Sequence, residues 1–236
     1  MQYYLSEVAD ILLSHDAAFV GGAFEEEHCS LHMICCTACL FRDISSTVTH
    51  REALQDTFYL LTRRRRYPID MPDPNGYTAL LRYLQDPHHE FYLVDELLLA
   101  GARGGLCLYS NANAAIIIAQ SRSTHASSVQ RLGPLIQDTN AGDSLGRNAL
   151  HYCAFNGDKP LAEVLFRIEG IDVNAKASNG DTALHLAAAH ATHGSGDMIE
   201  SLLASNADFT MGDGQEWSTL ELAVFNGEAH ICVDAY

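Results

Sequence analysis

The chain has 236 residues, and 14 Lys and Arg side chains against 30 Asp and Glu give it a formal net charge of −16. Hydrophobic residues make up 47% of the chain, which is typical of a globular protein and excludes a disordered acidic tail. The negative charge argues against general binding to nucleic acids or anionic membranes, because both require a positive surface. No apolar run approaches the roughly 20 residues that span a bilayer.

The N-terminal segment, MQYYLSEVADILLSHD, is a poor signal peptide because it has no basic start and carries acids within its apolar stretch. The seven cysteines form an odd set without the spacing of a disulfide scaffold, which favours a reducing compartment. We therefore expect an intracellular protein, located in the cytoplasm, the nucleus or both.

The chain repeats itself. Gly146 aligns with Gly180 and His151 with His185, an offset of 34 residues. The Leu-His step of these two copies locates further copies, which lie, in chain order, at Leu31–His32, Leu80–Leu81, Ile116–Ile117 and Leu220–Glu221. The additional residues between copies fall at turns, in IEGID and HATHGSGD, so a chance alignment is a poor explanation.

Two segments carry a family resemblance, GRNALHYCAFNGD and GDTALHLAAAHAT. Each is followed by an apolar stretch (LAEVLF, MIESLL) and then by IDVN or NADFT. The succession resembles the ankyrin repeat, whose pattern is D-x-x-G-x-T-P-L-H-x-A-A, a second helix and G-A-D-V-N. The resemblance implies an all-α solenoid of about five or six stacked helix-turn-helix units with β-turn fingers.

We expect one ankyrin-repeat domain over residues 1–236. Its units, in chain order, are a partial repeat at 1–22, a repeat with an insertion at 23–72, repeats at 73–105, 106–141 (degenerate), 142–175 and 176–211, and a partial repeat at 212–236. The half-repeats at both ends favour a fragment of a longer protein, and the alternative is a natural terminus with an improvised cap.

The long interval between His32 and Leu81 predicts the insertion. Within it, HREALQDTFYLLTRR is predicted to form a helix because Leu54, Phe58 and Leu61 recur at helical spacing. The following YPIDMPDPNG returns the chain through proline-rich turns.

The repeat makes specific demands on local chemistry. Gly76, Gly146 and Gly180 suit a turn position with positive φ, and Thr78 and Thr182 are expected to cap the first helices. Small residues are expected to let neighbouring first helices approach closely, and these are Cys153, Ala154, Ala187, Ala188 and Ala223.

Several positions depart from the family pattern. Asn148 and Ser218 replace the capping threonine, and Ile117 and Glu221 replace the histidine. The degenerate repeat also lacks its glycine, so we expect residues 112–141 to be irregular and looser than 146–209.

The densest set of metal-type side chains is His28, Cys29, His32, Cys35, Cys36 and Cys39. The last four of them fall at i, i+3, i+4 and i+7, a spacing that could present zinc ligands. The resemblance favours a structural reading, because His32 is the family's structural histidine and Cys35 takes the place of a small buried residue. We predict no metal and no cofactor.

Other polar features also have two interpretations. The basic run Arg63–Arg66 is either a localisation or partner contact, or a solvated helix end that complements the macrodipole. The turn histidines could respond to pH or simply be exposed, and these are His88, His89, His190 and His193. Asn174 resembles the ankyrin asparagine that some hydroxylases modify, and its commoner family role is to pin the finger turn by hydrogen bonds.

No catalytic motif is present, so we predict that the chain is not an enzyme. The resemblance implies a scaffold that binds a partner protein through the concave face and finger tips. The variable positions expected to contact it are Asn75, Tyr77, Ser144, Leu145, Arg147, Phe155, Asn156, Ser178, Asn179, Asp181, Ala189, His190, Trp217, Phe225 and Asn226. Phe155 and Phe225 could instead belong to the core.

The acidic chain predicts a basic or amphipathic partner segment, with no direct contact to nucleic acid and no membrane span. An alternative is the targeting region of a larger enzyme, a ubiquitin-system adaptor or a secreted host-directed effector. A weaker alternative is an enzyme within the insertion, around Cys35 to Arg66.

Overall fold

The computed structural model describes residues 69–86, 91–103, 110–121, 139–190, 195–215 and 217–225. It divides into two compact units, Met1–Tyr109 and Ser110–Tyr236. The described residues form eight α-helices, and their only β-structure is an isolated bridge between Gly212 and Ser218. The predicted all-α class is therefore confirmed for this part of the chain, whereas the predicted repeat boundaries stay predictions.

In the first unit, α4 (Ala79–Leu84) and α5 (Phe91–Leu99) pack against each other as the first and second helix of a repeat. The side chain of Thr78 caps α4 by accepting the backbone N–H of Leu81 at 3.3 Å, as predicted. Leu80, Leu81 and Leu84 of α4 and Leu93 and Leu97 of α5 are buried, so this pair encloses its own apolar layer.

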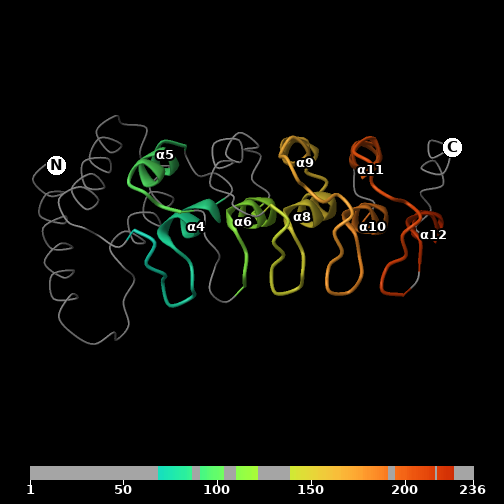
Figure 1. Ribbon diagram of the computed structural model, residues 1–236, viewed down its shortest axis with the longest axis horizontal. Helices are drawn as coiled ribbons and strands as arrows, with labels where there is room; N and C mark the ends of the chain where they lie inside the picture. Colours follow the sequence, from blue (N-terminus) through green and yellow to red (C-terminus); the bar gives the residue numbers. More distant parts are fainter. Residues whose placement is uncertain are drawn as a thin grey trace, which may run out of the picture. The chain divides into compact units, whose positions relative to one another are not determined.

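The second unit contains four first helices and two described second helices. The first helices lie in a row, with the finger loops on one side and the second helices on the other (Figure 1). The first helices are α6 (Ala114–Gln120), α8 (Ala149–Asn156), α10 (Ala183–Ala189) and α12 (Thr219–Phe225), and the second helices are α9 (Lys159–Phe166) and α11 (Ser195–Ala204). Consecutive first helices pack on one another, and α9 and α11 pack on α8 and α10.

Small side chains lie where first helices meet. Cys153, Ala154, Ala187 and Ala188 are all at most 1% exposed, as the sequence predicts. Leucine and methionine side chains from α9 and α11 fill the space on the other side, and burial of each contributes roughly 1.5–3 kcal/mol. Neighbouring first helices therefore approach closely, and both sets of helices contribute large apolar side chains to the core.

The finger turns require left-handed backbone. Gly76, Gly146 and Gly180 have φ values of 80°, 70° and 87°, which confirms the prediction. In the degenerate repeat the equivalent residue is Asn111, with φ of 56°. Asparagine tolerates this region better than other residues with a β-carbon, so the missing glycine does not abolish the turn.

The helix caps fix the alignment of the repeats. Asn148 and Thr182 each accept the backbone N–H of the histidine three residues later. Asn113 caps α6 in the same way and accepts the N–H of Ile116 at 2.9 Å. The predicted placement of the Leu-His pair at Ile116–Ile117 is therefore wrong by one residue, because the cap puts Ile116 at the histidine position.

Residues 114–119 of α6 are buried. The rest of the degenerate repeat lies outside the described residues, so its predicted looseness stays a prediction.

Each structural histidine joins its own repeat to the following finger. Nε2 of His151 lies 3.1 Å from the backbone oxygen of Asp181, and Nε2 of His185 lies 3.0 Å from that of Met211 and 3.2 Å from that of Trp217. Nδ1 of each ring accepts the backbone N–H of its own capping residue at 3.2 Å. Burial lowers the pKa of His151, so its ring is neutral near pH 7.

The two caps differ in how they meet the histidine. The Thr182 hydroxyl accepts the His185 N–H and can donate to Nδ1 at 2.8 Å. In the other pair, Oδ1 of Asn148 lies 2.6 Å from Nδ1 of His151, and Nδ2 of Asn148 has no hydrogen-bond partner. If the neutral His151 ring carries its proton on Nε2, Nδ1 and Oδ1 of Asn148 are two acceptors that face each other. If the proton is on Nδ1, Nε2 and the Asp181 carbonyl are two acceptors that face each other.

Gly180 is constrained by its neighbour as well as by its φ. A β-carbon at Gly180 would lie 2.5 Å from the backbone nitrogen of Gly214 in the next finger. Gly170 has a similar φ of 83°, but a β-carbon there would have no atom within 4 Å. Substitution of Gly170 therefore tests backbone strain alone, whereas substitution of Gly180 tests the same strain together with close packing between fingers.

We expect Gly170→Ala to reduce the free energy of unfolding by about 1 kcal/mol, because only the left-handed φ is strained. Gly180→Ala should cost at least about 1 kcal/mol more, because the next finger must also move. Urea unfolding followed by circular dichroism measures both. Equal losses would show that the contact between fingers contributes nothing.

Replacing the asparagine cap should stabilise the protein. We expect Asn148→Thr to raise the free energy of unfolding by about 1 kcal/mol, because a hydroxyl serves both the His151 N–H and Nδ1. The reciprocal variant, Thr182→Asn, should lose a similar amount. Thermal unfolding of both variants tests this, and a stabilising Thr182→Asn would contradict it.

Candidate functional site

Carboxylates hold the finger turns in shape. In three described fingers, one Asp oxygen accepts hydrogen bonds of 2.7–3.0 Å from the backbone N–H groups two and four residues later, and these residues are Asp73, Asp143 and Asp213. Ala177 takes this position in the finger before α10, where Oδ1 of Asn179 accepts the Asp181 N–H instead. The fingers are thus preorganised, which lowers the entropy cost of binding at their tips.

In two of these fingers, the second oxygen of the carboxylate binds a side chain from the first helix. Oδ2 of Asp73 accepts from Nε and Nη2 of Arg82, at 3.0 and 2.5 Å. Burial alone would raise the pKa of Asp73, but the backbone N–H of Tyr77 and the Arg82 guanidinium hold it below its ordinary value. Oδ2 of Asp143 accepts the hydroxyl of Tyr152 at 2.5 Å, and burial together with this carboxylate raises the pKa of Tyr152.

The predicted contact residues do not form one uniform surface. The exposed ones are Asn75, Ser144, Leu145, Ser178, Asn179, Ala189, His190, Trp217 and Phe225, and the half-buried ones are Tyr77, Arg147, Phe155, Asn156 and Asp181. Asn226 lies outside the described residues. In the second unit, finger residues 143–147, 177–181, 213–215 and 217 and helices α8, α10 and α12 form what we call the finger face (Figure 1).

Two of the half-buried residues serve neighbouring repeats. The Phe155 ring meets the His190 ring edge-on, with centroids 4.3 Å apart. Nδ2 of Asn156 donates to the backbone oxygen of Ala119 at 2.8 Å. Phe155 and Asn156 thus join α8 to its neighbours on both sides. In this part of the finger face, these side chains contact neighbouring repeats of the protein itself.

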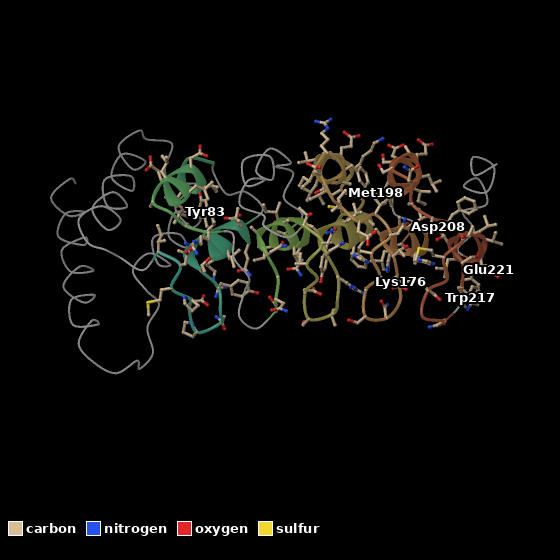
Figure 2. All side chains as sticks on the ribbon, in the orientation of Figure 1. Tyr83, Lys176, Met198, Asp208, Trp217 and Glu221 are labelled. Carbon is tan, nitrogen blue, oxygen red and sulfur yellow. The ribbon has the colours of Figure 1, made fainter. Side chains whose placement is uncertain are left out.

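A second aromatic pair, Trp217 in the finger before α12 and Phe225 at the end of that helix, has no such cover among the described residues. The Trp217 and Phe225 rings meet edge-on with centroids 5.7 Å apart, and their exposed fractions are 39% and 75%. Figure 2 labels Trp217 beside the finger that leads into α12 and Glu221 on that helix. Phe155 and Phe225 hold equivalent positions, so the structure distinguishes two residues that the sequence treats alike.

A cavity of about 620 Å³ opens next to this pair. Its lining is Asn179, Asp181, His185, Ala189, Asp213, Gly214, Gln215, Trp217, Leu222 and Phe225. The sequence did not single out His185, Asp213 and Leu222 as site residues. The equivalence of Asp213 with Asp73 and Asp143, five residues before a capping residue, could have identified the carboxylate.

Ser218 and Glu221 cap α12 reciprocally. The Ser218 hydroxyl accepts the Glu221 N–H at 3.3 Å, and the Glu221 carboxylate accepts the Ser218 N–H at 2.7 Å. Hydrogen bonds from the Ser218 N–H and hydroxyl lower the pKa of Glu221. The carboxylate at the histidine position therefore stays ionised and adds negative charge close to Asp213.

Asn174 has a structural role. Its Oδ1 accepts the Asp208 N–H at 2.8 Å, and its Nδ2 donates to the backbone oxygen of Asn206 at 3.3 Å. Asn140, which the sequence analysis missed, makes the same two contacts with Gly170 and Asp172 one repeat earlier. The predicted pinning by hydrogen bonds is thus present, and modification of Asn174 stays a prediction.

Several predicted features fall outside the described residues. They are the partial repeat at 1–22, the insertion helix, the metal-type cluster His28–Cys39, the basic run Arg63–Arg66, and the turn histidines His88, His89 and His193. Within the described part of the chain, no helix combines the length and hydropathy needed to cross a membrane.

Comparison with known proteins agrees with the geometry. A family model for ankyrin repeats, in three copies, matches residues 115–213. Neurogenic locus notch homolog protein 1 from Homo sapiens, Mus musculus and Rattus norvegicus is 31% identical over 103 residues, which is 44% of this chain. The match covers only 4% of the length of those relatives. Residues 115–213 therefore form ankyrin repeats, as the sequence pattern predicts.

Proposed function

We propose that the chain recognises a partner protein through the α12 end of the finger face. Ankyrin repeats are in general protein-interaction modules, which sets the class of function but names no partner. The observation that carries the proposal is the exposed pair Trp217 and Phe225 beside the cavity. Large aromatic side chains in such positions commonly dominate binding energy.

The charges around this pair favour a basic partner segment. Asp181 and Asp213 line the cavity, and Glu221 lies on α12 next to it. Arg147 is the basic residue among the described finger residues, and it belongs to the finger before α8. A negative surface attracts Lys and Arg side chains over distances up to about a Debye length, and it repels nucleic acid.

The scaffold is suited to this role because its fingers are held by their own hydrogen bonds. The Asp213 carboxylate fixes two backbone N–H groups of the last described finger, and His185 fixes the backbone oxygen of Trp217. A partner therefore meets a preformed surface and loses little affinity to ordering of the loop.

Peptide display on the full-length chain tests the proposal. We expect enrichment of peptides that combine basic and apolar residues, and Trp217→Ala or Phe225→Ala should weaken their binding by roughly 30-fold or more. Leu99→Ala is the matched control, because Leu99 is 77% exposed on α5, a second helix. Thermal unfolding of each variant separates binding from packing.

The proposal fails if both aromatic variants bind the selected peptides with unchanged affinity. It also fails if they lose stability while keeping affinity, because these side chains would then be packing residues.

A further inference from the structure

One finger of the protein holds an arginine between a carboxylate and an aromatic ring. The Arg82 guanidinium donates twice to Oδ2 of Asp73, and its Cζ lies 4.9 Å from the centre of the Tyr77 ring. Oδ1 of Asp73 meanwhile accepts the N–H groups of Asn75 and Tyr77 at 2.9 Å. The guanidinium thus gains an ion pair and a cation–π contact from a single finger.

The last described finger repeats this arrangement without the arginine. Counted from the capping residue, Asp213 is equivalent to Asp73, Trp217 to Tyr77 and Leu222 to Arg82. Oδ1 of Asp213 accepts the Gln215 and Trp217 N–H groups at 2.7 and 2.9 Å, as in the first finger.

Leucine cannot donate a hydrogen bond, and no described side chain donates to Oδ2 of Asp213. In the finger before α8, by contrast, the Tyr152 hydroxyl binds the equivalent oxygen. The carboxylate and the aromatic ring are therefore retained, while the donor is missing.

The vacant position coincides with the cavity. Asp213, Trp217 and Leu222 all line it, and its volume of about 620 Å³ falls in the range of ligand-binding pockets. Its described lining contains two carboxylates and no Lys or Arg. Nζ of Lys176, a basic group outside this lining, donates to the backbone oxygen of Gly212 at 2.9 Å.

We propose that this cavity receives an arginine side chain of the partner protein. The guanidinium donates to Oδ2 of Asp213 and lies against the Trp217 ring, in the arrangement that Arg82 adopts on Asp73 and Tyr77. This inference rests on the proposed function and names the chemistry of the partner residue. Arginine fits better than lysine, because a planar guanidinium can pair with a carboxylate and stack on an aromatic ring at the same time.

Trp217 makes the site directly measurable, because it is the single tryptophan of the chain. The probes are acetyl-Ala-Arg-Ala-amide and the same peptide with lysine or citrulline, titrated into the full-length protein while Trp217 fluorescence is recorded. We expect saturable binding of the arginine peptide with a Kd on the order of millimolar. The lysine peptide should bind about threefold to tenfold more weakly, and the neutral citrulline peptide should not bind measurably.

Two variants test the geometry. Asp213→Asn keeps an acceptor for the finger N–H groups but removes the charge, so the arginine peptide should bind about tenfold more weakly. Asp197→Asn, on the exposed first turn of α11, changes the net charge equally and should leave binding unchanged. Leu222→Arg should place its own guanidinium in the cavity. We expect the Trp217 fluorescence of this variant to resemble that of the arginine-saturated protein, and added peptide should cause no further change.

Leu222→Met controls for the loss of leucine in the filled variant. If Leu222→Arg fails to fold, the Asp213→Asn result decides alone. Binding of the citrulline peptide as tightly as the arginine peptide, or unchanged affinity in Asp213→Asn, would overturn the inference. Either outcome leaves the proposed function standing if displayed peptides still depend on Trp217 and Phe225, so the two failures are distinguishable.

Discussion

The hydrogen bonds on both sides of the His151 and His185 rings are the interaction on which the order of the stacked repeats depends. One nitrogen accepts the N–H of the histidine's own capping residue, and the other reaches a backbone oxygen of the next finger. A buried carbonyl that loses such a partner costs about 1–3 kcal/mol, more than the bond itself contributes. Asn140 and Asn174 join the loops after the second helices in a similar way. The repeat of α8 and the repeat of α10 are therefore held together at both levels, by His151 and by Asn174.

Close contact between fingers follows from this arrangement. Once the histidine sets the position of the next finger, the backbone of Gly180 meets that of Gly214, and no room is left for a β-carbon. The same packing turns the remaining finger side chains outward, as the exposure of Leu145 and Asn179 illustrates. The residues that hold the stack and the residues available to a partner are thus different members of the same short turn.

Differences between equivalent positions decide where side chains of this surface are covered by the protein and where they are exposed. Phe155 is covered by His190, whereas Phe225 is 75% exposed. The second oxygen of the finger carboxylate meets Arg82 in one repeat and Tyr152 in another, but Leu222 takes that position on α12. A repeated backbone with unequal side chains can therefore place a binding site at one repeat without changing the fold.

Several features were predictable from the sequence because they depend only on near neighbours along the chain. The glycine turns at Gly146 and Gly180, the caps at Thr78 and Thr182 and the small residues of the first helices all follow from local backbone chemistry. The structure decided, through the local cap at Asn113, that Ile116 holds the histidine position, because Ile116 and Ile117 are equally apolar and the repeat pattern did not separate them. It also decided that Asp213, Trp217 and Leu222 share a cavity with Asp181. That cavity depends on side chains from adjacent repeats, about one repeat length apart in sequence, which meet only after the units have stacked.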